Sequence, residues 1–220
     1  MTARDDTPLG DLSVIIPVRD GAATIAAAVE STAAHADGLA EIIVVDDGSV
    51  DASAAVARAA SPLARVIAGR GLGPAAARND GVRAARGELV GFCDADDLWL
   101  AGSPDPRRAA LTDDPTCVAL GRAQVERDGV PVGVPATVTL FGAVLARREL
   151  LLAHPLAEEL MRGEDVEWFL RVQDAGVPLH RSSAVVMAYR RRPGSLSHDS
   201  SAGLLAGLRN AIERRGAGAA

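Results

Sequence analysis

Short apolar runs alternate with alanine-rich segments over the first hundred residues of the chain. The apolar runs lie at residues 12–18, 41–45, 64–68 and 88–93. Runs of this length with β-branched residues are typical of strands that are covered on both faces. The segments between the runs have helical composition and lie at residues 21–36, 50–60 and 74–85. This β-α-β-α-β-α-β order predicts an α/β fold with a mostly parallel central sheet flanked by helices.

The second half of the chain has a less regular pattern, in which prolines interrupt a helical stretch at residues 105–111. The pair Asp128-Gly129 separates apolar runs at 118–125 and 130–132, and such a pair predicts an antiparallel hairpin. We expect further strands at 138–145 and 184–189, and helices at 148–153 and directly after 163–165. A C-terminal helix is also expected to pack its apolar face against the domain, with the residues Leu204, Leu205, Leu208 and Ile212 on that face.

Composition and charge narrow the class of protein. The 220 residues are 48% hydrophobic but only 3% aromatic, so Ala, Val, Leu and Ile must fill the core. All 23 basic residues are Arg, and the net charge of −6 argues against a nucleic-acid partner. Two cysteines are too few for a disulfide framework, and the N-terminus has no apolar signal region. No run approaches the roughly 20 apolar residues that span a bilayer. We therefore expect a soluble, cytoplasmic protein.

Acidic residues follow three of the predicted strands, at the point where each strand ends. These stretches are Pro17-Val18-Arg19-Asp20, Asp46-Asp47-Gly48-Ser49 and Asp94-Ala95-Asp96-Asp97. Because ligands bind at the carboxyl ends of parallel strands, we expect these side chains to share one rim. Three carboxylates within four positions repel one another, and a divalent cation held by their oxygens would relieve that repulsion. The alternatives are a solvated acidic turn or a helix N-cap at Asp96 or Asp97.

A glycine-rich stretch at residues 69–73 follows the third predicted strand and opens a helix. Its spacing does not match a dinucleotide-binding loop, because Pro74 stands where a glycine is required. A phosphate-binding P-loop is excluded as well, because the chain contains no Lys. The residues of interest are Arg78 and Asn79 on the first turns of this helix, which are expected to point toward the acidic rim; the alternative is that they lie on an exposed face of the helix.

Six segments together resemble the family 2 glycosyltransferases, which have the nucleotide-sugar-binding fold called GT-A. The matching segments are Ser13–Val18, Ile43–Asp51, Ala77–Gly81 with Ala85–Glu88, Phe92–Asp97, Gly163–Asp165 and Tyr189–Ser197. They occur in the order typical of the family. The resemblance implies a Rossmann-like, mostly parallel sheet with a small antiparallel region on the acceptor side. It also implies a single domain over 1–220, with a nucleotide-sugar-binding half at 12–97, an acceptor and catalytic half at 98–198 and a C-terminal helix and tail at 199–220.

The resemblance implies a donor site that contains a divalent cation. The donor is a nucleotide-diphosphate sugar of the UDP, dTDP or GDP type, and its negative charges lie near an acidic rim, so Mn²⁺ or Mg²⁺ must bridge them. Asp96 matches the direct metal ligand, and Asp94 matches a contact to the ribose or to water on the metal. His198 is carried as a further ligand, since some members complete the metal shell with a late histidine.

The same resemblance assigns residues that hold the nucleotide. An acid that accepts a hydrogen bond from a ring N–H of the base is matched by Asp47, with Asp46 nearby. Arg78 matches a basic residue beside the base or the diphosphate. The residues expected to line the base pocket or contact the nucleotide at the end of the first strand are Pro17, Val18 and Arg19. The family often has other residue types at Arg19 and Asp20, so the contacts there differ from the usual pattern.

Asp165 matches the catalytic base of the family. Most such members invert the anomeric centre in one displacement, in which a carboxylate removes the proton of the acceptor. Glu164 and Asp165 come from a different part of the chain than the metal site, as attack from the opposite face of the sugar requires. The alternative is helix capping, because acidic residues favour a helix N-terminus.

The sequence therefore predicts an inverting, metal-dependent glycosyltransferase. The alternative is a non-catalytic protein of the same fold that binds nucleotide sugars, and a nucleotidyltransferase ranks last because the phosphate loop and Lys of that chemistry are missing. The acceptor stays open, because the region between residues 97 and 163 matches the family least. An acceptor at a bilayer would require peripheral docking.

Overall fold

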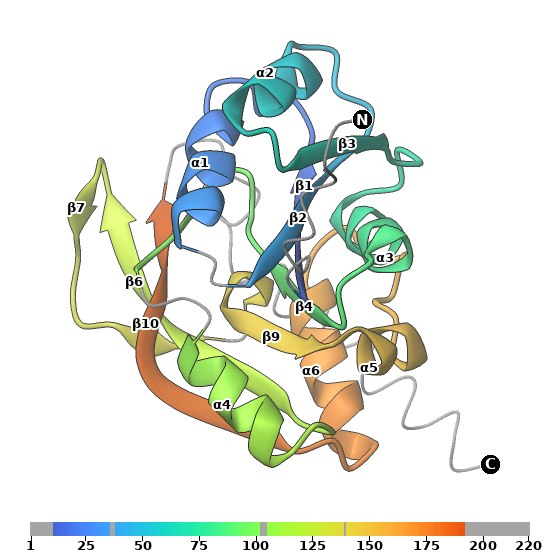
Figure 1. Ribbon diagram of the computed structural model, residues 1–220, viewed down its shortest axis with the longest axis vertical. Coiled ribbons are helices and arrows are strands. Elements are labelled where there is room, and N and C mark those ends of the chain that lie inside the picture. The colour runs from blue at the N-terminus through green and yellow to red at the C-terminus, as the bar shows by residue number, and fades with distance from the viewer. Residues whose placement is uncertain (1–10, 36–37, 102–104, 139, 192–220) are drawn as a thin grey trace, which may run out of the picture.

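The structure is a computed structural model that describes residues 11–35, 38–101, 105–138 and 140–191. One curved, mixed sheet runs through the molecule, and helices cover both of its faces (Figure 1). Its strands follow the order β3-β2-β1-β4-β9-β6-β10-β5, and two short strands, β7 and β8, pair with β6. This arrangement confirms the predicted mixed α/β fold.

The first half has the predicted β-α-β-α-β-α-β order. Its elements are β1 (Leu12–Val18), α1 (Ile25–His35), β2 (Leu39–Asp46), α2 (Ser53–Ala60), β3 (Ala64–Ala68), α3 (Pro74–Ala84) and β4 (Leu89–Phe92). Strand β1 pairs in parallel with β2 on one side and with β4 on the other, and β2 pairs in parallel with β3. The parallel sheet follows from the apolar runs, because strands buried on both faces cannot tolerate alternating polar residues.

The second half extends the same sheet. Its elements are β5 (Leu98–Trp99), α4 (Asp105–Asp113), β6 (Val118–Arg127), β7 (Val130–Pro131), β8 (Ala136–Thr137), the 3₁₀ turn η1 (Phe141–Ala143), β9 (Val144–Arg147), α5 (Arg148–Ala153), α6 (Glu164–Asp174) and β10 (Leu179–Arg191). Strand β9 is antiparallel to both β4 and β6, and β10 is parallel to β6. The carboxyl ends of β6 and β10 therefore point the same way as those of β1 and β4.

Some boundaries differ from the predicted ones. The hairpin is confirmed by the antiparallel pairing of β6 with β7. The strand predicted at 138–145 overlaps the observed one only at 144–145, because 141–143 form the 3₁₀ turn and the strand begins only at Val144. Strand β10 begins at Leu179 rather than at residue 184, because pairing with β6 extends it. The predicted C-terminal helix lies outside the described residues.

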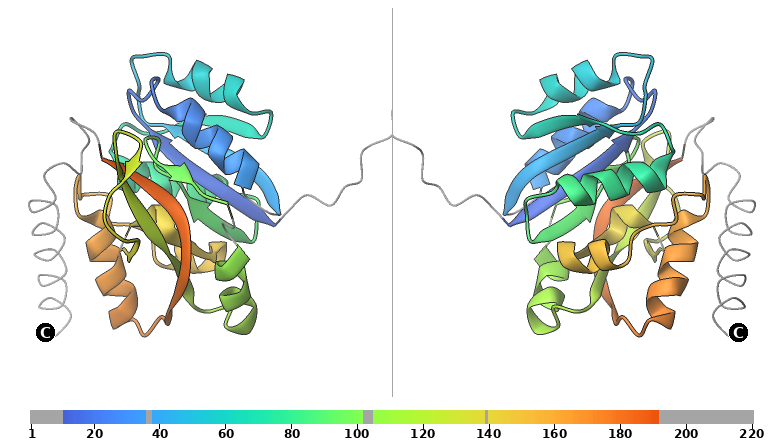
Figure 2. Two further views of the ribbon diagram at one scale, coloured as in Figure 1. Left: turned by 90° about the vertical axis from the view of Figure 1, so that its left-hand side faces the viewer. Right: turned by 90° about the vertical axis from the view of Figure 1, so that its right-hand side faces the viewer.

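Two apolar cores lie on opposite faces of the sheet, under the helices that Figure 2 shows on its two sides. On β1, Ile15 faces the core formed with α3, α5 and α6, whereas Val14 and Ile16 face the core formed with α1, α2 and α4. Helix α3 approaches β1 closely at Gly81, where an added Cβ would lie 2.4 Å from Cγ2 of Ile15. This close contact fixes the height of α3 above the sheet, and with it the position of the residues on the first turns of α3.

Two loops at the carboxyl edge of the sheet are bonded to each other. Asp20, with a φ of 52°, accepts a hydrogen bond from the Val50 amide at 2.8 Å and donates its own amide to Ser49 Oγ at 3.0 Å. Gly21 N donates to Ser53 Oγ at 2.9 Å. The acidic rim therefore begins with two loops that fix each other. Within the described residues, no helix is both long and apolar enough to cross a membrane.

Candidate active site

The acidic loop after β4 is tied to the end of β10. Asp97 is 1% exposed, and its Oδ1 accepts the Arg190 amide at 2.8 Å. The Arg190 side chain donates in turn to the carbonyl oxygen of Asp96 at 2.6 Å. Burial raises the pKa of Asp97 well above its ordinary value, and the charges of Asp94 and Asp96 raise it further. Asp97 therefore anchors strand β10 through Arg190. Strand β5 and not a helix follows this loop, so neither Asp96 nor Asp97 is a helix N-cap.

Arg78 connects this loop to helix α6. The guanidinium is buried; Nη2 donates to Asp94 Oδ1 at 2.6 Å and Nη1 donates to Glu164 Oε1 at 2.8 Å. Burial by itself lowers the pKa of Arg78, but the charges of Asp94 and Glu164 outweigh it and raise that pKa above the ordinary value. Arg78 is therefore a fixed cation between two carboxylates that lie 70 residues apart in the sequence.

Arg78 rests on a cluster of aromatic rings. Its guanidinium carbon lies 5.3 Å from the centroid of Phe141, the first residue of η1. The rings of Phe92 and Trp168 each lie 5.0 Å from the Phe141 ring, and Phe169 lies 5.2 Å from Trp168. We call Phe92, Phe141, Trp168 and Phe169 the aromatic cluster. It contains every Phe of the chain, and it is the floor on which Arg78 and the start of α6 are placed.

A second buried arginine supports this floor from the other side. Arg107 of α4 is 0% exposed, and its Nη1 donates to the carbonyl oxygens of Ala143 and Val144 at 3.1 and 3.2 Å. Its guanidinium carbon lies 5.1 Å from the centroid of Trp99, whose indole N–H donates to the Phe92 carbonyl. Burial lowers the pKa of Arg107 to about 9. Arg107 therefore holds the end of η1, the turn that carries Phe141.

Asp165 lies in the first turn of α6, beside Glu164. Gly163 precedes the helix with a φ of 76°, a left-handed conformation that glycine adopts without strain. The Oδ1 atom of Asp165 accepts the Val166 amide at 2.8 Å. Burial raises the pKa of Asp165 to about 6, with a further contribution from the charge of Glu164. The structure thus brings the helix turn that carries the predicted base close enough to Arg78 and Asp94 for their charges to affect the pKa of Asp165.

Asp47 holds the glycine-rich stretch that follows β3. It is 3% exposed, and its two carboxylate oxygens accept the amides of Gly71 at 2.8 Å and Gly73 at 2.7 Å. Asp46 Oδ1 accepts the Ser49 amide at 2.9 Å. Each carboxylate oxygen keeps a further lone pair for another donor. No local pattern predicts that Asp47 binds these glycines, because its carboxylate and the two amides are 24 and 26 residues apart in the chain.

The residues predicted to contact the nucleotide lie at the end of β1. Val18 is buried and its carbonyl oxygen accepts the Asp47 amide at 2.8 Å, which brings the ends of β1 and β2 together. Pro17 is half-buried, and Arg19 is exposed beside them. His198 lies outside the described residues.

Asp94 and Asp96 fit a cation that is bound together with a diphosphate better than a cation that is enclosed by protein ligands alone. Among the described residues, no group of three or more His, Cys, Asp or Glu side chains is arranged to hold a metal. Asp94 and Asp96 supply hard oxygen donors on a half-buried loop. Mg²⁺ is usually held by one or two carboxylates together with substrate phosphates and water. The donor set therefore fits a cation that binds together with a diphosphate, and it does not fit an all-protein cage.

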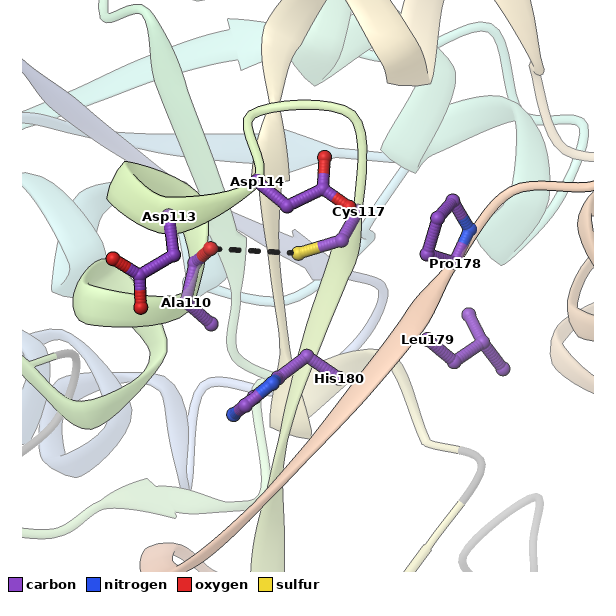
Figure 3. A pocket seen from close by; sticks show the side chains of 7 residues that line it. All are labelled: Ala110, Asp113, Asp114, Cys117, Pro178, Leu179 and His180. Carbon is purple, nitrogen blue, oxygen red and sulfur yellow. Dashed lines mark hydrogen bonds between the residues drawn. The ribbon is translucent and has the colours of Figure 1, made fainter.

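A pocket elsewhere in the molecule contains none of these residues. It lies where β6 and β10 begin (Figure 3). Because these strands run in the same direction as β1 and β4, this end of the sheet is opposite the acidic rim. Its lining residues are Ala110, Asp113, Asp114, Cys117, Pro178, Leu179 and His180. The Cys117 thiol makes only a weak 3.9 Å contact with the Ala110 carbonyl oxygen. The candidate active site is therefore the open rim around Arg78 and not this pocket.

The sequence and the fold identify the family. The model of Glycosyl transferase family 2 matches residues 13–159, and the chain belongs to this family. The structure is similar to that of S. aureus TarS 1–349 in complex with UDP-GlcNAc, with a TM-score of 0.70 and 22% identity over 84% of this chain and 60% of that chain. This likeness confirms the GT-A type of fold.

Curated relatives match parts of the chain. The succinoglycan biosynthesis protein ExoU of Rhizobium meliloti is 43% identical over 106 residues, 46% of this chain and 30% of that protein. The glucosyltransferase WfaP of Escherichia coli is 24% identical over 201 residues, 84% of this chain and 79% of that protein. The chain thus spans less than a third of the length of ExoU.

Three residues that shape the site gave little signal in the sequence. Arg190 lies within Tyr189–Ser197, one of the segments that resemble the family. The resemblance does not predict its contacts with the acidic loop. Phe141 is the only aromatic residue in an apolar stretch that was predicted as a strand. Arg107 lies in a proline-interrupted helical stretch and gave no signal, because a buried arginine cannot be told from an exposed one by its neighbours in the sequence.

Replacing Arg78 with Gln should destabilise the protein by about 3–5 kcal/mol, because Glu164 and Asp94 would lose a buried counterion. The free energy of unfolding is measured in urea at pH 7. Arg70→Gln is the matched control, since Arg70 is exposed and pairs with Asp80 and Glu158 at the surface, and it should cost much less. Equal losses in the two variants would contradict the role assigned to Arg78.

Replacing Asp165 with Asn should stabilise the protein above pH 6. The pKa of Asp165 is about 6 in the folded state and 3.8 as the ordinary value, so wild-type stability from this group is present below pH 4 and is lost as the pH rises to 6. The Asn variant lacks this loss and should be more stable by up to about 3 kcal/mol at pH 7.5. Urea titrations at pH 4 and pH 7.5 check it; a difference that does not depend on pH would contradict the raised pKa.

Proposed function

We propose that the protein is an inverting, metal-dependent glycosyltransferase that moves a sugar from a nucleotide-diphosphate donor to an acceptor hydroxyl or a similar nucleophile. One observation carries this proposal: Arg78 links Asp94, on the predicted donor side, to the helix turn that bears Asp165. Membership of Glycosyl transferase family 2 supports the same reading. The rim thus combines acidic donor-side residues with a separate carboxylate of raised pKa.

The donor is proposed to bind along the ends of β1 and β2. Pro17, Val18 and Arg19 would contact the nucleotide, and Asp47 would accept from the base through a lone pair that its glycine amides leave free. The structures of TarS with UDP-GlcNAc and with UDP support a donor of the UDP type. The dTDP and GDP types present a ring N–H as well and are tested beside it.

The cation is proposed to be Mn²⁺ or Mg²⁺, with Asp96 as its direct ligand and Asp94 beside it. When bound, such a cation neutralises charge on the diphosphate leaving group. Arg190 contributes by holding the carbonyl oxygen of Asp96, so that the loop keeps its shape under the repulsion of its own carboxylates.

Asp165 is proposed to act as the general base. At pH 7 a carboxyl with a pKa of about 6 is mostly ionised, yet it is a stronger base than an ordinary aspartate. It takes the proton of the acceptor hydroxyl as that oxygen forms its bond to the anomeric carbon. The bond from this carbon to the diphosphate oxygen breaks, and the diphosphate keeps the electron pair. One displacement of this kind inverts the anomeric centre.

The acceptor is proposed to carry a sugar hydroxyl. The name of WfaP describes transfer from UDP-Glc to GlcNAc-diphosphoundecaprenol, which is a lipid-linked sugar. A similar acceptor would bring this chain to a membrane surface by peripheral docking.

Donor and metal can be identified by a thermal-shift panel of UDP, dTDP and GDP and their sugars, with and without Mn²⁺. One nucleotide type should raise the Tm by about 5–10 °C at a hundredfold excess over its Kd, since ligands stabilise the state they bind. The shift should disappear on chelation and in Asp96→Ala. A shift that persists in both cases would contradict the metal assignment.

Asp165→Asn should lower the turnover number by about 10²–10⁴-fold, because it removes the general base while donor binding is kept. Transfer is measured with radiolabelled donor and an acceptor panel, and binding by calorimetry. Asp113→Asn is the control, since it makes the same change at the pocket where β6 and β10 begin, at the end of the sheet opposite the rim. Near-normal turnover in Asp165→Asn would overturn the base assignment.

Donor binding without transfer or donor hydrolysis in the wild type would favour the non-catalytic alternative, and pyrophosphate release from a nucleoside triphosphate would favour a nucleotidyltransferase.

A further inference from the structure

One guanidinium serves two carboxylates at the centre of the site. Arg78 is bonded to Asp94 at 2.6 Å and to Glu164 at 2.8 Å, and the side chains of Arg78 and Glu164 are 7% and 11% exposed. One cation is therefore shared by two carboxylates. Water screens the charges poorly around Arg78 and Glu164 and better around Asp94, whose side chain is 28% exposed.

A second buried glutamate on α6, Glu167, has a different arrangement of arginine hydrogen bonds from that of Glu164. Glu167 is 0% exposed and lies one turn further along α6. It pairs with Arg171, whose Nε donates to its Oε1 at 2.9 Å and whose Nη2 donates to its Oε2 at 3.4 Å. In this pair one guanidinium donates to both oxygens of a single carboxylate, whereas Arg78 divides its donors between two acids. Glu164 and Glu167 are thus alike in residue type, helix and burial but differ in how their arginine partner distributes its hydrogen bonds.

We propose that Glu164 is a positioning residue for Asp165: Arg78 fixes it at the start of α6, and because Arg78 is shared with Asp94, Glu164 keeps an unbalanced negative charge beside the base. The charged groups that face Asp165 are Glu164 from its own helix, Arg78 from α3 and Asp94 from the loop after β4. This inference rests on the proposed function, since it assigns Glu164 a task only if Asp165 is the base.

The charge of Glu164 makes Asp165 a stronger base than its place at the N-terminus of α6 alone would make it. A helix N-terminus favours ionised carboxylates and so lowers their proton affinity. Burial opposes this effect first, and the charge of Glu164 opposes it second, so that the pKa of Asp165 rises to about 6. A carboxylate whose pKa lies close to the working pH takes a proton with a greater driving force. Removing the charge of Glu164 should weaken the base without removing it.

The experiment measures the ionisation of Asp165 without turnover. The protein is labelled with ¹³C at the aspartate carboxyl carbons, the Asp165 signal is assigned with Asp165→Asn, and its midpoint is followed by NMR as a function of pH. Glu164→Gln should lower this midpoint by about one unit. Glu167→Gln, the matched control, should leave it within about 0.3 units. Glu164→Asp keeps the charge and should restore at least half of the shift.

Kinetics give an independent measurement. In Glu164→Gln the acid limb of the kcat profile should move to lower pH, and kcat above pH 7 should fall roughly 3–10-fold while KM for the donor is unchanged. A midpoint that stays in place in Glu164→Gln, or moves as far in Glu167→Gln, would overturn the inference alone. Normal turnover in Asp165→Asn would overturn the proposed function instead, so the two failures are distinguishable.

Discussion

The site depends on the burial of one guanidinium. A cation that is removed from water needs groups that replace its hydration, and Arg78 has two carboxylates for this purpose. These partners come from the loop after β4 and from the start of α6, so satisfying one arginine requires both halves of the chain to be in place. The aromatic cluster beneath it completes the arrangement, because a ring face favours a cation above it.

The aspartates of the rim have different roles because their carboxylates have different neighbours. The carboxylate of Asp47 is bonded to backbone amides and orders a loop, whereas Asp97 is buried and anchors the end of β10. Asp94 is held by Arg78, and burial leaves Asp165 with the raised pKa of a base. Each task follows from the groups around the carboxylate, because the side chains themselves are identical.

Much of this arrangement could be predicted from the sequence, and the part that could not has one physical cause. The strands of the first half follow from apolar runs, and the rim follows from acids at strand ends, both of which are local patterns. The partnership of Asp47 with Gly71, of Arg78 with Glu164 and of Asp97 with Arg190 joins residues far apart in the chain. Such pairs depend on the register of the whole sheet, as does the 3₁₀ turn at 141–143, where burial of Phe141 overrides strand propensity.

The two tryptophans of the chain lie on opposite faces of the sheet below this rim. Trp168 contacts Phe141, and the ring of Trp99 fills the space that Gly91 leaves open on β4. Both indoles are buried and both N–H groups are bonded to backbone carbonyl oxygens. The tryptophan fluorescence of the protein therefore originates entirely beneath the candidate active site. Its emission reports the integrity of that layer, whereas far-ultraviolet circular dichroism averages over every helix and strand.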